Sequence, residues 1–429
     1  MTGITVPTSR SRRPLVILLC AGFISVLGTS MSELALPWFA LGTGGGTSHA
    51  GVVAFADTAP YVVLQALSGP VVDKWGARAS CAAGNALAAV ALGAVPVLHL
   101  AGALGFGPLC ALVAVSAMAR GVADCAGNVL LPAVAERTGV PLARAVALSA
   151  GAMRGGLIAG AALAGVLLST VGVTSTLAVT AGAFAVASVL VMSCATATAR
   201  RPATAPRAGG APGGYRAELA EGLRFLRGDR LLLGIVVLIA VSNLLDQAFS
   251  AVLLPAWVKA HLDSPQALGL ITGTIGVGTV AGSVAGAWLG PRLRRSVTFR
   301  TGFLLAGAPR FLALCVCSTL APVLTVSLVA GIAGGLVNPL LGVLQYERIP
   351  PRLQARVLGA VKASAWAGIP FGGLLAGLAA GSVGVTAALA ATGLAFLLTS
   401  LVPFVLPSWR AMDTSPAPAP AEVRCAGSG

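Results

Sequence analysis

The chain alternates between long apolar runs and short segments that are polar, basic or rich in glycine. An α-helix rises about 1.5 Å per residue, so about 20 apolar residues cross the hydrocarbon core of a bilayer. Runs of this length recur twelve times, at residues 15–40, 50–71, 79–99, 107–132, 144–169, 173–194, 231–257, 266–289, 301–320, 322–345, 357–380 and 385–407. The pattern predicts an all-α integral membrane protein with twelve transmembrane helices, because a helix satisfies its own backbone hydrogen bonds in lipid.

Composition agrees with a membrane protein and argues against several other classes. Of 429 residues, 56% are hydrophobic and only 10% are charged, whereas a soluble domain carries about 25% charged residues. The net charge of +15 does not indicate a nucleic-acid partner, because the basic residues lie dispersed between apolar runs. The eight cysteines form no CxxC pair and there are three histidines, so no metal site and no cofactor is expected.

The basic residues assign a side of the membrane to each loop. With the N-terminus inside, 23 of the 28 Lys and Arg residues fall in inside loops and termini, and Lys259 alone falls outside. Cytoplasmic loops of membrane proteins carry an excess of Lys and Arg. The distribution predicts a multi-pass protein of the plasma membrane with both termini in the cytoplasm.

An internal repeat divides the chain into two halves. Residues 143–188 align without a gap on 355–400, where STVGVTSTLAVTAGAF lies over GSVGVTAALAATGLAF. Repeats of this kind are typical of transporters. The predicted organisation is an N-terminal six-helix half (1–194), a cytoplasmic linker with a short interfacial helix (195–230), a C-terminal six-helix half (231–407) and a disordered cytoplasmic tail (408–429).

The polar segment between the second and third runs carries a motif, GPVVDKWGAR at residues 69–78. It resembles the signature loop of the major facilitator superfamily, G-x-x-x-D-[RK]-x-G-[RK]-[RK]. It matches at five positions, Gly69, Asp73, Lys74, Gly76 and Arg78, and Ala77 departs from the pattern. The resemblance implies two pseudo-symmetric six-helix halves and a cytoplasmic gate at this motif. LALPWFAL at 34–41 and LLP at 130–132 resemble the branch of drug, macrolide and siderophore exporters.

Charged residues within the predicted spans are candidates for function, since a charge at mid-bilayer costs about 2.5–3.5 kcal/mol or more. The acids are Glu33, Asp57, Asp124 and Asp246, and the bases are Arg120, Arg154, Arg310 and Lys362. Asp124 follows Arg120 by one helical turn, so both lie on one face. Lys362 lies near an inner helix end and is expected to be an anchor that extends to the interface.

The resemblance implies that spans 1, 4, 7 and 10 line a central cavity. The polar residues on those spans are Glu33, Arg120, Asp124, Asn243, Asp246, Gln247 and Asn338. We expect Glu33 first, and Asp246 second, to bind a proton or a cationic substrate; Asp57 and Arg154 are further candidates. Burial moves the pKa of a carboxyl group toward neutrality, which suits proton exchange. The alternative for each residue is a fixed polar network that only orders the helices.

Glycines at four-residue spacing mark several spans. They are Gly156 and Gly160 in span 5, Gly278, Gly282 and Gly286 in span 8, and Gly368 and Gly372 in span 11. Gly165 of span 5 is a further candidate for helix packing. Small residues in such stripes let helix backbones approach closely. The resemblance implies that spans 5 and 8, and spans 2 and 11, meet where the halves move against each other. The span 5 stripe resembles an exporter motif whose proline is replaced by Ala161.

These observations predict a secondary active transporter that exports a small amphiphilic compound by alternating access, with proton antiport. The alternative on the same fold is a proton-coupled or facilitative importer of a small metabolite. No GxxxxGK[ST] loop for ATP occurs. An intramembrane enzyme would need clustered acids or a nucleophile with a base, and the sequence offers neither; a membrane scaffold would show no transport. The expected partners are a small-molecule substrate, protons and the lipid bilayer, and the protein is expected to be a monomer.

Overall fold

The structure is a computed structural model, and it describes residues 11–42, 44–194, 214–289, 292–349, 353–406, Trp409 and Met412. All regular elements in these ranges are helices. Twelve helical segments are long and apolar enough to cross a membrane. The predictions of an all-α membrane protein and of twelve spans are therefore confirmed, with boundaries that differ by several residues, as for span 9, which begins at Arg295.

The N-terminal half contains six spans and one short helix. Its elements are α1 (Arg13–Gly42), α2 (Gly46–Leu67), α3 (Gly69–Trp75), α4 (Ala77–Leu100), α5 (Phe106–Thr138), α6 (Leu142–Thr170) and α7 (Gly172–Ser193). The short helix α3 belongs to the 69–78 motif, so spans 1 to 6 are α1, α2, α4, α5, α6 and α7.

The C-terminal half also contains six spans, but three of them are interrupted. Its elements are α8 (Gly214–Gly228), α9 (Arg230–Ala248), the π-helix η1 (Phe249–Leu253), α10 (Leu254–His261), α11 (Pro265–Leu289), α12 (Arg295–Ala306), α13 (Ala308–Val316), α14 (Leu320–Arg348), α15 (Gln354–Ala367), α16 (Ile369–Val383) and α17 (Val385–Val405). Span 7 runs through α9, η1 and α10. Spans 9 and 11 break at Gly307 and Gly368, each followed two residues later by a proline that interrupts helical hydrogen bonding.

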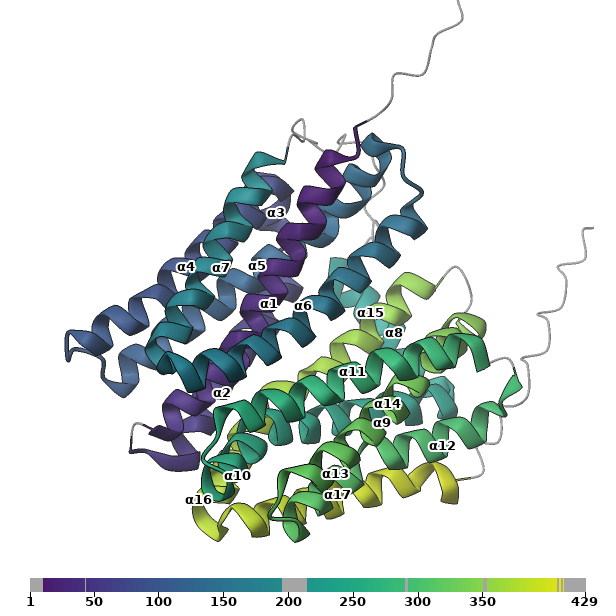
Figure 1. The fold of residues 1–429 in the computed structure, drawn as a ribbon. Helices are drawn as coiled ribbons and strands as arrows, with labels where there is room; N and C mark the ends of the chain where they lie inside the picture. Colours follow the sequence, from purple (N-terminus) through teal and green to yellow (C-terminus); the bar gives the residue numbers. More distant parts are fainter. Residues whose placement is uncertain are drawn as a thin grey trace, which may run out of the picture.

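The two halves converge at one end of the molecule and diverge toward the other (Figure 1). The arginine-rich segments lie at the end of the molecule where α1 starts and α2 finishes, and we call this the basic end. The other end is called the opposite end. Close backbone contacts between the halves lie near the opposite end. A Cβ atom at Gly51 of α2 would lie 2.8 Å from the carbonyl oxygen of Gly373 in α16. A Cβ atom at Gly165 of α6 would lie 3.0 Å from the Cα atom of Gly269 in α11.

The glycine stripes pack mainly against helices of their own half. In α6, a Cβ at Gly160 would lie 2.5 Å from the carbonyl oxygen of Leu27 in α1, and Gly156 also faces α1. Gly278, Gly282 and Gly286 of α11 face α14, and Gly368 and Gly372 face α9. Of the predicted glycines, Gly165 is the one that contacts the other half. Spans 5 and 8 and spans 2 and 11 do meet, through Gly165 with Gly269 and Gly51 with Gly373 and Gly377.

The segments outside the spans are partly described. In α8, Leu226 is buried in a cluster with Val357 and Val361 of α15. The prediction of a disordered tail from residue 408 is wrong for Trp409 and Met412, which are buried in the C-terminal half; the Trp409 ring stacks on Phe299 at 5.3 Å. The predicted flexible linker at 195–213 and the tail at 413–429 lie outside the described residues.

Candidate functional site: a charged cavity between the halves

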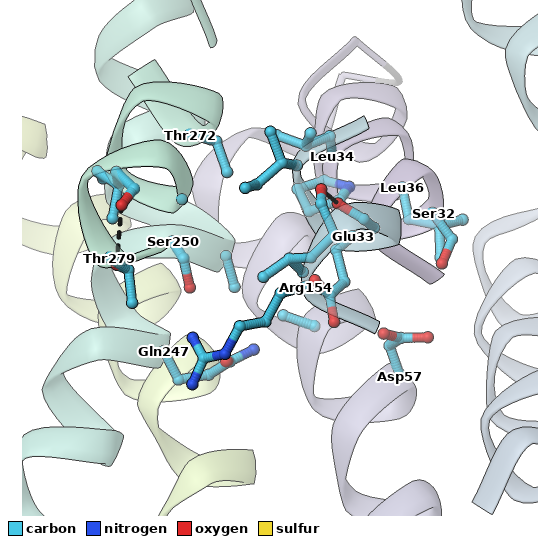
Figure 2. A pocket seen from close by; sticks show the side chains of 18 of the residues that line it. Ser32, Glu33, Leu34, Leu36, Asp57, Arg154, Gln247, Ser250, Thr272 and Thr279 are labelled. Atoms are coloured by element: carbon cyan, nitrogen blue, oxygen red, sulfur yellow. Dashed lines mark hydrogen bonds between the residues drawn. The ribbon is translucent and has the colours of Figure 1, made fainter. Parts of the chain in front are cut away.

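A cavity of about 210 Å³ lies between the two halves. Its walls come from α1, α2 and α6 of the N-terminal half and from α9, η1 and α11 of the C-terminal half. Most of the lining is apolar and includes Leu34, Leu36, Val53, Leu157, Ile158 and Ile275. Polar groups interrupt it at Ser32, Glu33, Asp57, Arg154, Gln247, Ser250, Thr272 and Thr279 (Figure 2). A site of this composition suits an amphiphilic compound, because apolar walls bind its body and few polar groups orient it.

Two oppositely charged side chains in this cavity form no ion pair with any residue that the structure describes. They are Glu33 of α1 and Arg154 of α6, and both are exposed to the cavity space. Figure 2 shows the Arg154 side chain extending across the cavity toward Gln247 of α9, and the Glu33 carboxylate on the wall formed by α1. The cavity therefore presents one available acid and one available base.

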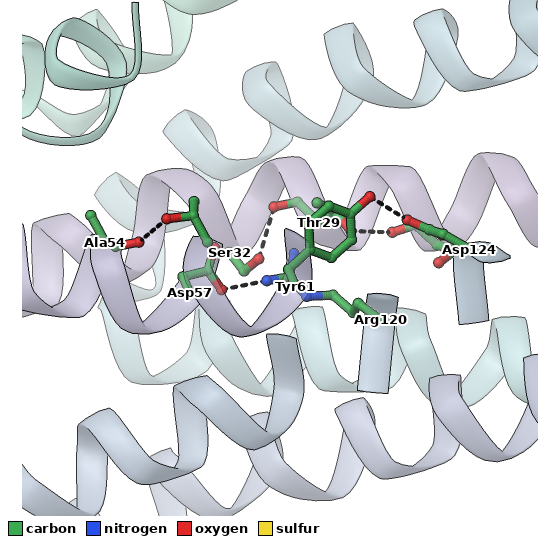
Figure 3. A network of polar contacts seen from close by, with 9 residues as sticks. Thr29, Ser32, Ala54, Asp57, Tyr61, Arg120 and Asp124 are labelled. Atoms are coloured by element: carbon green, nitrogen blue, oxygen red, sulfur yellow. Dashed lines mark hydrogen bonds and ion pairs between the residues drawn. The ribbon is translucent and has the colours of Figure 1, made fainter. Parts of the chain in front are cut away.

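The third charged group of the cavity, Asp57, is neutralised within the N-terminal half. The Arg120 guanidinium of α5 donates a hydrogen bond to the Asp57 carboxylate of α2 and forms a salt bridge with it (Figure 3). Arg120 is 4% exposed and Asp57 8%. A buried pair of this kind holds two helices in one relative position, since separating it would leave two buried charges uncompensated.

The polar network continues from this pair toward the basic end. One turn after Asp57, the Tyr61 hydroxyl donates a hydrogen bond of 2.8 Å to Asp124 of α5. Gln65 donates in turn to the Tyr61 oxygen at 2.9 Å. The Arg120 guanidinium lies 5.8 Å from the centre of the Tyr61 ring. Arg120 and Asp124 share a helix face as predicted, but they do not pair with each other; their partners are Asp57 and Tyr61 of α2.

A second ion pair, buried on its arginine side, lies in the C-terminal half. Arg310 of α13 donates a hydrogen bond to Asp246 of α9. The Arg310 guanidinium also lies 4.8, 5.4 and 5.7 Å from the ring centres of Phe249, Phe311 and Phe396. The Asp246 side chain is 45% exposed and that of Arg310 12%. Asp246 is thus neutralised by a partner that aromatic rings hold in place.

The cavity differs from the one expected from the resemblance, because it is lined by spans 1, 2, 5, 7 and 8. Glu33 and Gln247 line it as expected, and so do Asp57 and Arg154. The lining does not include Arg120, Asp124, Asn243, Asp246 or Asn338. Asn243 donates instead to the carbonyl oxygen of Ala365 at 2.9 Å, and Asn338 is an exposed residue of α14.

Sequence reasoning missed the hydroxyl groups of the cavity, Ser250, Thr272 and Thr279. Thr272, Gly276 and Thr279 follow one another at intervals of four and three residues, which places them on one face of α11. That spacing was the available signal, but it does not distinguish a face that lines a cavity from a face that packs on a neighbour.

The 69–78 motif forms a short helix followed by a turn. Gly69 begins α3, and Gly76 has a φ of 85°, a conformation that favours glycine. The side chains of Asp73 and Lys74 are exposed, and Asp73 forms no ion pair among the described residues. Arg78 donates to the carbonyl oxygen of Met192 at 2.8 Å. In this conformation the motif is bound at Arg78 and its acid is accessible.

The fold, the two halves and the cavity between them define a polytopic transporter architecture. The family model of the major facilitator superfamily matches residues 18–246 and 236–424. The chain belongs to this superfamily.

Curated relatives and solved structures narrow the comparison. The chain is 30% identical over 421 residues to the multidrug efflux pump Tap of Mycolicibacterium fortuitum, and the alignment covers 96% of this chain and 100% of that protein. It is 29% identical over 416 residues to the pump of the same name of Mycobacterium tuberculosis, covering 95% and 96% of the two chains.

Solved structures agree in fold. The nucleoside transporter NupG has a TM-score of 0.69 at 13% identity, covering 94% of this chain and 99% of that one. A bacterial homolog of the human lysosomal transporter Spinster, inward-facing and unoccupied, has a TM-score of 0.71 at 13% identity, covering 96% and 100%. At such identities these structures are evidence for the fold alone.

Proposed function

We propose that the protein is a secondary active exporter that moves small amphiphilic compounds out of the cell by alternating access in exchange for protons. The observation that carries the proposal is the Glu33 carboxylate in a largely apolar cavity between the two halves, where it forms no ion pair with the residues described. The efflux pumps that cover nearly the whole chain support export as the direction.

Glu33 is the group that we propose for coupling. Asp57 and Asp246 each have an arginine partner, and Asp124 accepts a hydrogen bond from Tyr61. Glu33 retains a carboxylate that can take up either a proton or a positively charged group of the substrate. Because one carboxylate cannot bind both, proton entry displaces the substrate and substrate entry displaces the proton. This competition couples the two fluxes if the form with neither proton nor substrate at Glu33 does not switch between the inward-open and outward-open states.

The basic end is proposed to face the cytoplasm, since it carries the arginine-rich loops. The halves then converge on the outer side, so the described conformation is the one that receives substrate from inside (Figure 1). The accessible Asp73 fits this state. We infer that Asp73 and Lys74 bind the other half when the basic end closes. Because residues of one chain line all sides of the cavity, we propose that the monomer is the functional unit.

The test uses inside-out membrane vesicles that contain the wild-type protein or Glu33→Gln. The vesicles are energised, and accumulation of lipophilic dyes is followed with and without a protonophore. Wild-type vesicles are expected to accumulate dye only while the proton gradient exists, and Glu33→Gln vesicles are expected to accumulate none. Asp263→Asn makes the same change from acid to amide at an exposed residue outside the cavity lining, and it is the matched control.

The sign of transport separates export from import. If intact cells with the protein take up a compound faster than cells without it, and vesicles accumulate nothing, the exporter assignment is wrong. If accumulation survives in Glu33→Gln, export stands and the coupling residue is a different acid.

A further inference from the structure

Of the intramembrane bases, Arg154 is the one that forms neither an ion pair nor a ring contact within the described part of the chain. The span interiors contain four basic residues. Arg120 and Arg310 are paired with aspartates, and the Lys362 ammonium lies 4.9 Å from the centre of the Trp366 ring. Arg154 has neither a carboxylate nor a ring partner among the described residues. Its side chain instead extends into the cavity, from α6 in one half toward Gln247 in the other (Figure 2).

An unpaired guanidinium in this position requires a counter-charge during transport. In the open conformation water in the cavity can solvate it. When the halves close around the cavity that water is lost, and an unpaired charge in an apolar environment is strongly unfavourable. A guanidinium carries five N–H donors in a planar arrangement that suits carboxylate and similar oxygen groups. Glu33 is a carboxylate of the cavity that forms no ion pair with the described residues, but in the proposed cycle it is bound to the substrate amine during this step, so the substrate is the available source of such a group.

We propose that Arg154 is a specificity-determining residue that binds an anionic oxygen group of the substrate. The preferred substrate is then an amphiphilic zwitterion, whose protonated amine pairs with Glu33, whose anionic group pairs with Arg154, and whose body contacts the apolar walls. The inference deepens the proposed function and rests on it. The inference specifies a zwitterionic substrate, whereas Glu33 alone indicates only that the substrate carries a positive charge.

The charge balance of the cavity separates this class from simple lipophilic cations. A zwitterion forms two opposite pairs with Glu33 and Arg154, and Asp57 is neutralised by Arg120, so the closed cavity carries no net charge. A monovalent cation pairs with Glu33 but leaves Arg154 without a counter-charge and is repelled by it. Arg154 therefore favours zwitterions and selects against cations of the same size and shape.

The test compares a cationic rhodamine ester with its free acid, which is a zwitterion at neutral pH. The dyes differ only at the group that Arg154 is proposed to bind. Binding to the purified full-length protein in detergent is measured by fluorescence anisotropy for wild type, Arg154→Gln and Arg154→Lys. Arg144→Gln is the control, because Arg144 lies on the same helix at the basic end, outside the cavity lining.

Wild type is expected to bind the free acid roughly tenfold more tightly than the ester, as fits a charge-assisted hydrogen bond. Arg154→Gln should remove this preference by weakening binding of the acid and not of the ester. Arg154→Lys should keep part of the preference, and Arg144→Gln all of it. Size-exclusion profiles establish that each variant is folded.

Several results would overturn the inference. They are equal binding of the two dyes by wild type, no binding of either dye, or an equal loss of both in Arg154→Gln. A gain of affinity for both dyes in Arg154→Gln would mean that Arg154 competes for Glu33, and it would also refute the proposal. The binding assay uses no gradient, so its outcome is independent of proton-driven accumulation in vesicles, and failure of the substrate class is distinguishable from failure of the exporter assignment.

Discussion

The buried pair of Asp57 and Arg120 gives a quantitative test of how the N-terminal half is stabilised. We consider Asp57→Leu, which leaves the Arg120 guanidinium 4% exposed and without its carboxylate. Arg120 Nε already has no hydrogen-bond partner, so the substitution removes the main charge compensation of the side chain. Removing one partner of a buried ion pair typically costs about 3–5 kcal/mol. We expect the free energy of unfolding to fall by that amount.

Two comparisons make the expectation specific. Replacing both partners, in Asp57→Leu with Arg120→Met, should restore the free energy of unfolding to within about 1 kcal/mol of wild type, because apolar residues of similar volume can replace a buried pair. In the C-terminal half, Asp246→Leu should cost less, about 1–2 kcal/mol, because the Arg310 side chain that remains is 12% exposed, against 5% for Arg120, and three phenylalanine rings still surround it.

The assay is unfolding of the purified protein by titration with a denaturing detergent, followed by tryptophan fluorescence. The ordering expected is wild type close to the double variant, then Asp246→Leu, then Asp57→Leu. The reasoning is refuted if Asp57→Leu lowers the free energy of unfolding by less than about 1 kcal/mol, or if the double variant is as unstable as Asp57→Leu.

Three further predictions concern a contact between the halves at Gly51, the contact of Lys259 with Trp38, and the buried Trp409. Gly51→Val adds a side chain where a Cβ would lie 2.8 Å from a carbonyl oxygen of the other half, so it should keep the opposite end from closing and abolish dye accumulation in vesicles. Gly22→Val is the control and should retain dye accumulation, because no atom lies within 4 Å of the added Cβ. Lys259→Gln removes an ammonium that lies 5.6 Å from the Trp38 ring centre across the halves. A cysteine introduced at Leu41, about one turn after Trp38 in α1, should react with a thiol label faster in Lys259→Gln than when Lys259 is retained, and unchanged labelling would exclude a closing role. Trp409→Ala should lower the free energy of unfolding by about 3–5 kcal/mol, because the indole is almost fully buried; a loss below about 1 kcal/mol in the detergent titration would show that the indole is not packed there.

The sequence predicted the features that depend on composition along one helix. Span number follows from the length of the apolar runs, and the repeat of 143–188 on 355–400 indicates two halves. The membership of Glu33 and Gln247 in the cavity was also predicted and agrees with their position in the structure. Assignment of their roles in transport stays a prediction until the vesicle experiment is done.

Features that depend on how one helix is rotated against another could not be predicted in the same way. Arg120 pairs with Asp57, 63 residues away, although Asp124 lies one turn along the same helix. Gly282 has the spacing expected of a glycine between the halves, yet it faces α14. Spacing identifies a helix face, but the neighbour of that face is set by the packing of all twelve spans.

The π-helix in span 7 has a mechanical consequence. Its five residues, Phe249–Leu253, lie between the Asp246–Arg310 pair and α10, which carries Lys259. A π-helical turn accommodates one residue more than an α-helical turn, so its conversion to α-helix advances the following chain by about 1.5 Å and rotates it by about 100°. Ser250 and Ala251 in this segment line the cavity. A substrate that favours the π-helical or the α-helical form of this segment would rotate α10 relative to α9, which the Asp246–Arg310 pair holds in place. Binding in the cavity would then determine whether Lys259 still lies over Trp38 at the opposite end.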